Sequence, residues 1–180
     1  SICVVDRLSN DDCDGAITLP VGGNCNGALT FTVVGSTASP AGVPAGCVGG
    51  YGYDVWFKFT ATTANPSIDI TNAGANFTNR RIQLYRGTCG GLISVACANA
   101  FPYNAAGLIP GTTYYIRVYS TSATVPTTNA NFTICISTAN PPPKYGNSYV
   151  NISKRTNGGI VQNGDTLEIR MTINHTSGTL

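Results

Sequence analysis

The hydrophobic residues of this chain recur at every second position, which is the period of a β-strand with one buried face. The densest run, YDVWFKFT, spans residues 53–60 and holds the only tryptophan. Its valine and two phenylalanines share one side of an extended chain, whereas Trp56, Lys58 and Thr60 share the other. The run therefore predicts a half-buried strand at the centre of the fold.

Further alternating runs predict strands at residues 29–33, 67–70, 81–85, 92–97, 114–119 and 131–136. Turns rich in glycine and proline separate them, such as GTCGG at 87–91, because glycine adopts positive φ at little cost. Strands at intervals of roughly 8–12 residues with such turns are typical of β-sandwiches and jelly rolls. The chain is therefore predicted to be all-β, with a jelly-roll or β-sandwich domain at residues 9–137.

A second β segment is predicted after this domain. Three consecutive prolines favour a stiff polyproline II linker, which we place at residues 138–146. Alternating runs follow at 148–153 and 164–174. Two or three strands do not bury an apolar face alone. Residues 147–180 are therefore an incomplete segment that either continues in a longer polypeptide or is completed by another chain.

The N-terminal arm, residues 1–8, is a candidate for that completion. Ile2, Val4 and Val5 make it apolar, and an extended apolar segment can add a strand to a neighbour's open sheet. Head-to-tail donation of this kind does not close on itself and makes a fibre. The arm therefore predicts self-association.

The composition excludes some classes of protein. Charged residues make up 10% of the chain, the net charge is +2, and Arg80-Arg81 and Lys154-Arg155 are isolated basic pairs. Nucleic-acid binding is therefore not expected, because it needs clustered basic side chains. No apolar run approaches the roughly 20 residues that span a bilayer. A surface of Thr, Ser, Asn and Gly suits a protein that works outside the cell.

The cysteines predict disulfides in an oxidising compartment. Seven are present without any C-x-x-C spacing, and the single His175 lies far from them, so a zinc site is not expected. Six cysteines can pair in several ways. One of them joins cysteines that are neighbours along the chain, Cys89 with Cys97 and Cys25 with Cys47, and ties the ends of the domain through Cys13 and Cys135. Cys3 is left over, either as a free thiol or as a bridge to another chain.

Catalysis is not expected. His175 has no partners for a nucleophilic triad, and Asp54 and Asp69 are the only carboxylates placed for glycoside hydrolysis. Asp54 is better explained as the end of a turn, and Asp69 as a solvent-facing residue of a strand.

A calcium site is one interpretation of the carboxylates that open the sandwich domain. Asp11, Asp12 and Asp14 offer the oxygen ligands that Ca²⁺ prefers. Solvated turn carboxylates are the alternative. No other cofactor is expected.

A binding face is predicted on the central strands. Tyr115, Arg117 and Tyr119 share one side of their strand, and an open face that added Trp56 and Tyr85 would stack on sugars or anchor a protein. The alternative is that loops 35–52 and 98–111 cover this face and that Trp56 belongs to a core.

Five motifs carry a resemblance to a known family: NDDCDGAI, DVWFKF, LYRGTCGGL, PGTTYYIRVY and FTICI, in this order. They resemble the CUB-like, pre-peptidase-C-terminal-like modules of exported Bacteroidota surface proteins. The resemblance implies a jelly roll, export, a role in adhesion or as an accessory domain, and recurrent cysteines at the six positions paired above. It does not imply catalysis. The run GDTLEIRMTIN at 164–174 is similar to the opening of bacterial surface Ig-like repeats.

The sequence thus predicts an extracellular or cell-surface, non-catalytic structural or adhesive module, with a strand-donating fibre subunit as its most specific form. Its expected partners are other protein chains, through self-association, and glycans. The alternative is a carbohydrate-binding accessory domain of a secreted hydrolase.

Overall fold

A computed structural model describes residues 7–22, 24–25, 28–39, 53–122 and 124–138, and the backbone of three strands at 144–151, 156–157 and 167–174. The chain divides into two compact units, Ser1–Ala139 and Asn140–Leu180. Within the described residues, no helix is long and apolar enough to cross a membrane.

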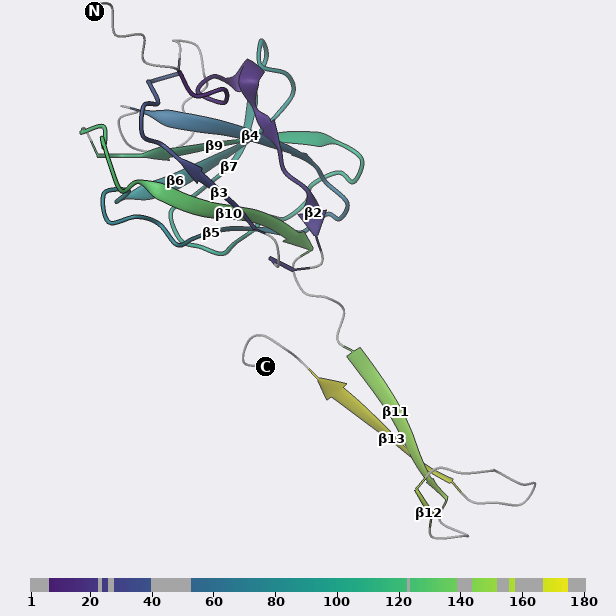
Figure 1. Ribbon diagram of the computed structural model, residues 1–180. Coiled ribbons are helices and arrows are strands. Elements are labelled where there is room, and N and C mark those ends of the chain that lie inside the picture. The colour runs from purple at the N-terminus through teal and green to yellow at the C-terminus, as the bar shows by residue number, and fades with distance from the viewer. Residues whose placement is uncertain are drawn as a thin grey trace, which may run out of the picture. The chain divides into compact units, whose positions relative to one another are not determined.

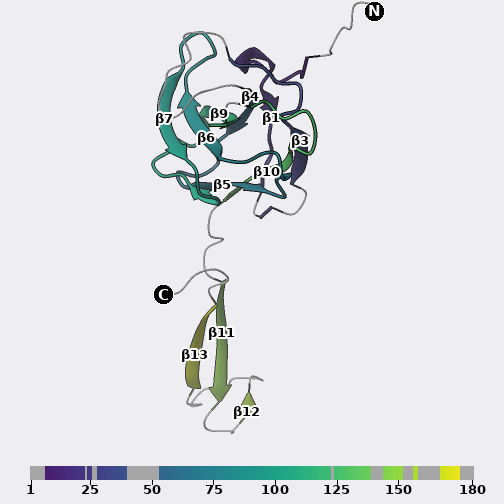
Figure 2. The same ribbon diagram turned by 90° about the vertical axis from the view of Figure 1, so that its left-hand side faces the viewer.

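The first unit is a sandwich of two β-sheets (Figures 1 and 2). The first sheet has the order β1-β4-β9-β6-β7 and consists of β1 (Ile17–Thr18), β4 (Asp54–Thr60), β9 (Thr113–Ser120), β6 (Arg80–Arg86) and β7 (Ile93–Ala98). The second has the order β2-β10-β5-β8, with β3 also on β10, and consists of β2 (Val21–Gly22), β10 (Asn131–Thr138), β5 (Pro66–Thr71), β8 (Tyr103–Asn104) and β3 (Leu29–Thr32). A short 3-10 helix, η1 (Cys13–Gly15), precedes β1.

The second unit holds a three-stranded sheet in the order β12-β11-β13. Its strands are β11 (Lys144–Asn151), β12 (Thr156–Asn157) and β13 (Leu167–Asn174). Strand β11 begins at Lys144, directly after the three prolines.

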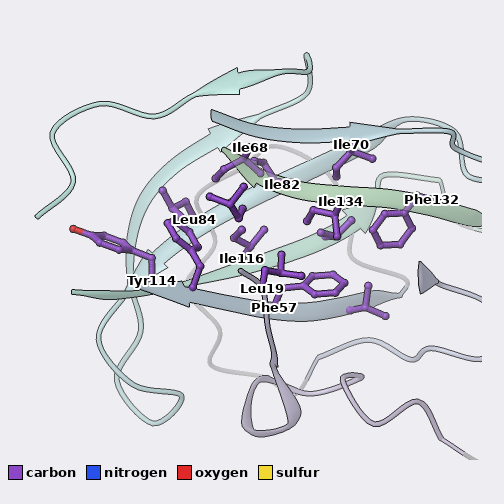
Figure 3. Close-up of a cluster of buried hydrophobic side chains, with 14 of the residues drawn as sticks. Leu19, Phe57, Ile68, Ile70, Ile82, Leu84, Tyr114, Ile116, Phe132 and Ile134 are labelled. Atoms are coloured by element: carbon purple, nitrogen blue, oxygen red, sulfur yellow. The ribbon is translucent and has the colours of Figure 1, made fainter. Parts of the chain in front are cut away.

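The main core lies between the two sheets of the sandwich. Figure 3 shows Phe57, Ile82, Leu84 and Ile116 of the first sheet directed toward the strands of the second. The second sheet contributes β-branched and aromatic residues, among them Ile68, Ile70, Phe132 and Ile134. Burial of these side chains is the main source of stability, at about 1.5–3 kcal/mol for each large one.

The all-β sandwich predicted from the alternating pattern is confirmed. Each run predicted as a strand between residues 29 and 136 forms one, within one or two residues at its ends. The sidedness of β9 is also confirmed: Tyr114, Ile116 and Val118 belong to the main core, whereas Arg117 and Tyr119 do not.

The turn between β6 and β7 requires glycine. Gly87 has a φ of +101°, and a Cβ atom there would lie 2.4 Å from the carbonyl oxygen of Gly91. Both the left-handed conformation and this close approach exclude an ordinary side chain, which explains the first glycine of the GTCGG motif.

The predicted disulfide pairing is wrong. Cys13 is bonded to Cys89, and Cys25 to Cys135, with Cα–Cα distances of 5.5 and 5.7 Å. Cys97 is also disulfide-bonded, but not to Cys89. Cys3 and Cys47 lie outside the described residues, as do Ile2, Val4 and Val5 of the arm.

The sheets explain why the pairing differs. In the hairpin, Cys97 stands opposite Gln83 of β6, several residues along the strand from the turn that holds Cys89, which is too far for a disulfide. Strand β2 pairs in parallel with β10 and thereby brings Cys25 to Cys135. Cys13 sits in η1, which contacts β4 of the first sheet, whereas Cys135 belongs to the second.

Candidate functional site

The five residues of the predicted binding face do come together. They lie on the outer side of the first sheet, where Trp56 stands opposite Arg117, Lys58 opposite Tyr115, and Tyr115 in turn opposite Tyr85. Tyr119 occupies the same side one pair further along β9. The period of two therefore predicted their common side correctly.

The face is nevertheless closed, which agrees with the alternative that Trp56 belongs to a core and not with an open aromatic platform. Trp56, Tyr85 and Tyr119 have no exposed surface, Arg117 is 2% exposed, and only Tyr115 is half-buried. Among the described residues, Ala16 and Leu92 pack with Trp56 and Tyr85 in a second hydrophobic cluster. The residues before β1 and the β6–β7 turn therefore cover this face, and Cys13–Cys89 ties the two covering segments together.

A buried ion pair lies beneath this cover. Arg117 Nε donates a hydrogen bond of 2.8 Å to Asp54 Oδ2, and Arg117 Nη2 donates to the same oxygen. Trp56 Nε1 donates to Asp54 Oδ1 at 3.0 Å and to Ser39 Oγ at 2.8 Å. The Trp56 ring stacks on Tyr85 with centroids 5.6 Å apart, and the Arg117 guanidinium lies 5.8 Å from the Trp56 centroid. These contacts give Trp56, Tyr85 and Arg117 a structural role.

The three carboxylates considered for calcium are not gathered around one point. No group of three metal-ligating side chains occurs within the described residues, which include Asp11, Asp12 and Asp14. Asp11 is buried and accepts hydrogen bonds from the Thr37 amide at 2.6 Å and from its hydroxyl at 2.7 Å. Arg7 pairs with Asp11 and Asp12, and hydrogen bonding to Asp11 raises the pKa of the Arg7 guanidinium. Asp11 thus holds loop 37–39 in place.

An open polar pocket lies at one end of the first sheet. It has a volume of about 240 Å³ and is lined by Asn79, Arg80, Arg81, Asn99 and Phe101. Because β6 and β7 are antiparallel and Ile82 stands opposite Ala98, the residues that begin β6 lie beside those that follow β7. Asn79 enters β6 with a φ of +50°, a conformation that asparagine tolerates better than most residues.

The pocket presents polar groups with a single aromatic ring. Arg80 Nη1 donates to the Phe77 carbonyl at 2.9 Å, which fixes that side chain. Asn79 and Asn99 are exposed, and Phe101 is half-buried with its ring packed against the main core. Amide groups and guanidinium donors beside an aromatic ring can recognise the hydroxyl groups and the apolar face of a sugar.

Sequence reasoning did not find this pocket. Arg80-Arg81 was noted only as an isolated basic pair, because the pattern does not show which loop lies beside it. The sequence does hold one signal for the pocket. Polar residues stand at the start of β6, and Asn99 and Phe101 follow β7, the other strand of the same hairpin.

A second pocket, of about 150 Å³, lies beside the Cys25–Cys135 disulfide. Its lining is mainly apolar, with Leu19, Leu29 and Ile134 among the side chains, and no charged residue contributes. It lacks polar groups that would orient a ligand.

A family model described as galactose binding domain-like, and associated with the T9SS secretion system of Bacteroidota, matches residues 9–134. The chain belongs to this family. Searches of the curated proteins and of the solved structures found no match to this chain. The galactose-binding-domain-like match supports the predicted β-sandwich of an exported Bacteroidota protein. It does not extend to the CUB-like and pre-peptidase-like assignment. Domains of this kind are typically non-catalytic.

Proposed function

We propose that this chain is a non-catalytic glycan-binding module of an exported protein, and that the pocket at the start of β6 is its binding site. The observation that carries the proposal is the lining of that open pocket: two asparagines, two arginines and one half-buried phenylalanine. Its volume, somewhat below the roughly 300–1,000 Å³ typical of pockets for drug-sized ligands, suits one sugar ring.

The membership of a galactose-binding-domain-like family agrees with this proposal. The predicted aromatic face is closed, whereas the pocket is a polar concave site in the described part of the sandwich. An accessory domain needs no nucleophile or general base, and Asp54, one carboxylate considered for hydrolysis, is held by Arg117.

Asn99→Ala is expected to weaken binding of the glycans that the full chain retains on a glycan array by about 3–10-fold, because it removes one neutral hydrogen bond. Titration calorimetry with a retained glycan measures the change. Asn104→Ala is the matched control, since it deletes the same amide from an exposed position of β8 outside the pocket lining. Equal loss in both variants, or retention of no glycan by the full chain, would count against the proposal.

Self-association is a second candidate role. Strand β13 is at the edge of its three-stranded sheet, and an edge strand presents unpaired backbone groups to which another strand can add. The N-terminal arm of a neighbouring copy is the proposed donor, which would make the module adhesive or filamentous.

Deletion of residues 1–5 is expected to abolish ordered polymers of the purified chain in negative-stain images. The deletion keeps Arg7 and its pairs with Asp11 and Asp12, so the sandwich stays intact. Cys3→Ser in the full chain separates assembly through strand pairing, which it preserves, from assembly through an intermolecular disulfide. A full-length chain that stays monomeric at high concentration would refute this role.

A further inference from the structure

The pocket at the start of β6 carries two positive charges and no negative one. Arg80 and Arg81 both line it, and its other lining residues are two asparagines and a phenylalanine. The ion pairs found within the described residues involve Arg7 and Arg117, and neither Arg80 nor Arg81 takes part in one. Within the described residues, neither charge is therefore compensated by a carboxylate.

The nearest carboxylate by strand register does not neutralise them. Arg81 stands opposite Tyr119 of β9, and Tyr119 stands opposite Asp54 of β4. Asp54 is thus two strands away, with its backbone about 10 Å from that of Arg81. Its two oxygens already accept hydrogen bonds from Arg117, Trp56 and Ser39. Asp54 is consequently paired with Arg117 and not with Arg81.

The donors of the two arginines are also incompletely used. Arg80 donates one hydrogen bond, to the Phe77 carbonyl. The Nε atoms of Arg80 and Arg81 are buried and have no acceptor within the described structure. Leaving such donors unpaired is costly, and more so for a charged group. Arg117 offers a contrast within the same sheet, because Asp54 fills its fork of Nε and Nη2.

We infer that this pocket selects sugars that carry a carboxylate or a sulfate group. Both groups present paired oxygens that match the planar fork of arginine, and both would compensate the charge of Arg80 and Arg81. Asn79, Asn99 and Phe101 would contact the ring itself, as they would for a neutral sugar. The inference rests on the proposed glycan-binding function and adds the chemical class of the ligand.

The test uses three probes that differ only at C6 of one ring: methyl galactoside, its 6-sulfate, and the corresponding galacturonide. Titration of the full chain at low salt is expected to give affinities at least about tenfold higher for the two charged probes, since hydrogen bonds to charged groups are the stronger ones. The advantage is expected to shrink at 1 M salt, because the pocket is open and the attraction is screened. Comparison of the sulfate with the galacturonide identifies which anion is preferred.

Variants assign the selectivity to the pocket. Arg81→Gln is expected to remove most of the advantage of the charged probes over the neutral one. Arg86→Gln is the matched control, since it makes the same change of charge at the exposed far end of β6 and should leave the preference intact.

Two results would overturn the inference. The first is equal affinity for all three probes, including no binding of any of them, and the second is a preference that survives Arg81→Gln. In either case the proposed function is judged separately, because retention of neutral glycans on the array and its loss in Asn99→Ala would still support a glycan-binding module.

Discussion

Asp54→Ala is expected to lower the free energy of unfolding by about 3–5 kcal/mol, because it leaves the Arg117 guanidinium buried without its carboxylate. Asp54 has no exposed surface, and the Arg117 side chain is 3% exposed, so water cannot replace the lost partner. The variant also removes the acceptor of hydrogen bonds from Ser39 and Trp56. Chemical denaturation followed by circular dichroism measures the change.

Two further variants make this prediction specific. Asp69→Ala removes a half-buried carboxylate of β5 for which the described structure shows no ion pair, and it should stay within about 0.5 kcal/mol of the parent. The double variant Asp54→Leu with Arg117→Met removes both charges and should be more stable than Asp54→Ala. If Asp54→Ala unfolds at the same denaturant concentration as Asp69→Ala, the ion pair does not hold the fold together.

Trp56→Ala is expected to cost about 3–5 kcal/mol of stability, the usual range for truncating a buried large aromatic side chain. The ring is fully buried, stacks on Tyr85 and donates its Nε1 hydrogen to Asp54 and Ser39. Trp56→Phe keeps part of the packing and loses the donor, so its cost should be intermediate. Unfolding is followed by circular dichroism, because Trp56 is the only tryptophan and both variants lose its fluorescence.

The same residue allows a test without mutation. In the parent chain, Trp56 fluorescence is expected to be blue-shifted and resistant to quenching by acrylamide. A red-shifted, readily quenched Trp56 would contradict the closed face and restore the aromatic platform.

Ile109→Ala is the control for the denaturation of the Trp56 variants. It truncates a side chain that is 58% exposed and should change stability by no more than about 0.5 kcal/mol.

The strands could be predicted because their signal is local. Alternation in β4 and β9 identifies two sides of each strand from neighbouring residues alone, and the structure places Phe57 and Ile116 together in the main core. Whether the opposite side is open could not be read in this way. Trp56 and Tyr85 are covered by Ala16 and Leu92, which come from remote parts of the chain, and an amphipathic aromatic residue suits a buried face and a wet one equally well.

The candidate pocket was harder to predict for a related reason. Its residues are ordinary polar side chains at strand ends, and only the register of β6 against β7 shows that Arg81 and Asn99 belong to one site. The disulfides could not be predicted from proximity along the chain, because Cys89 is bonded to the remote Cys13 and not to Cys97 of the same hairpin.

The separation of the bonded cysteines has a consequence for how the domain matures. The two described bridges join residues 76 and 110 positions apart, so neither can close on a short stretch of newly exported polypeptide. Cys25 has no partner until Cys135 has arrived, and by then every strand of the sandwich is available. The Cys25–Cys135 bridge can therefore form only after most of the domain has emerged, and it cannot guide the first pairing of strands.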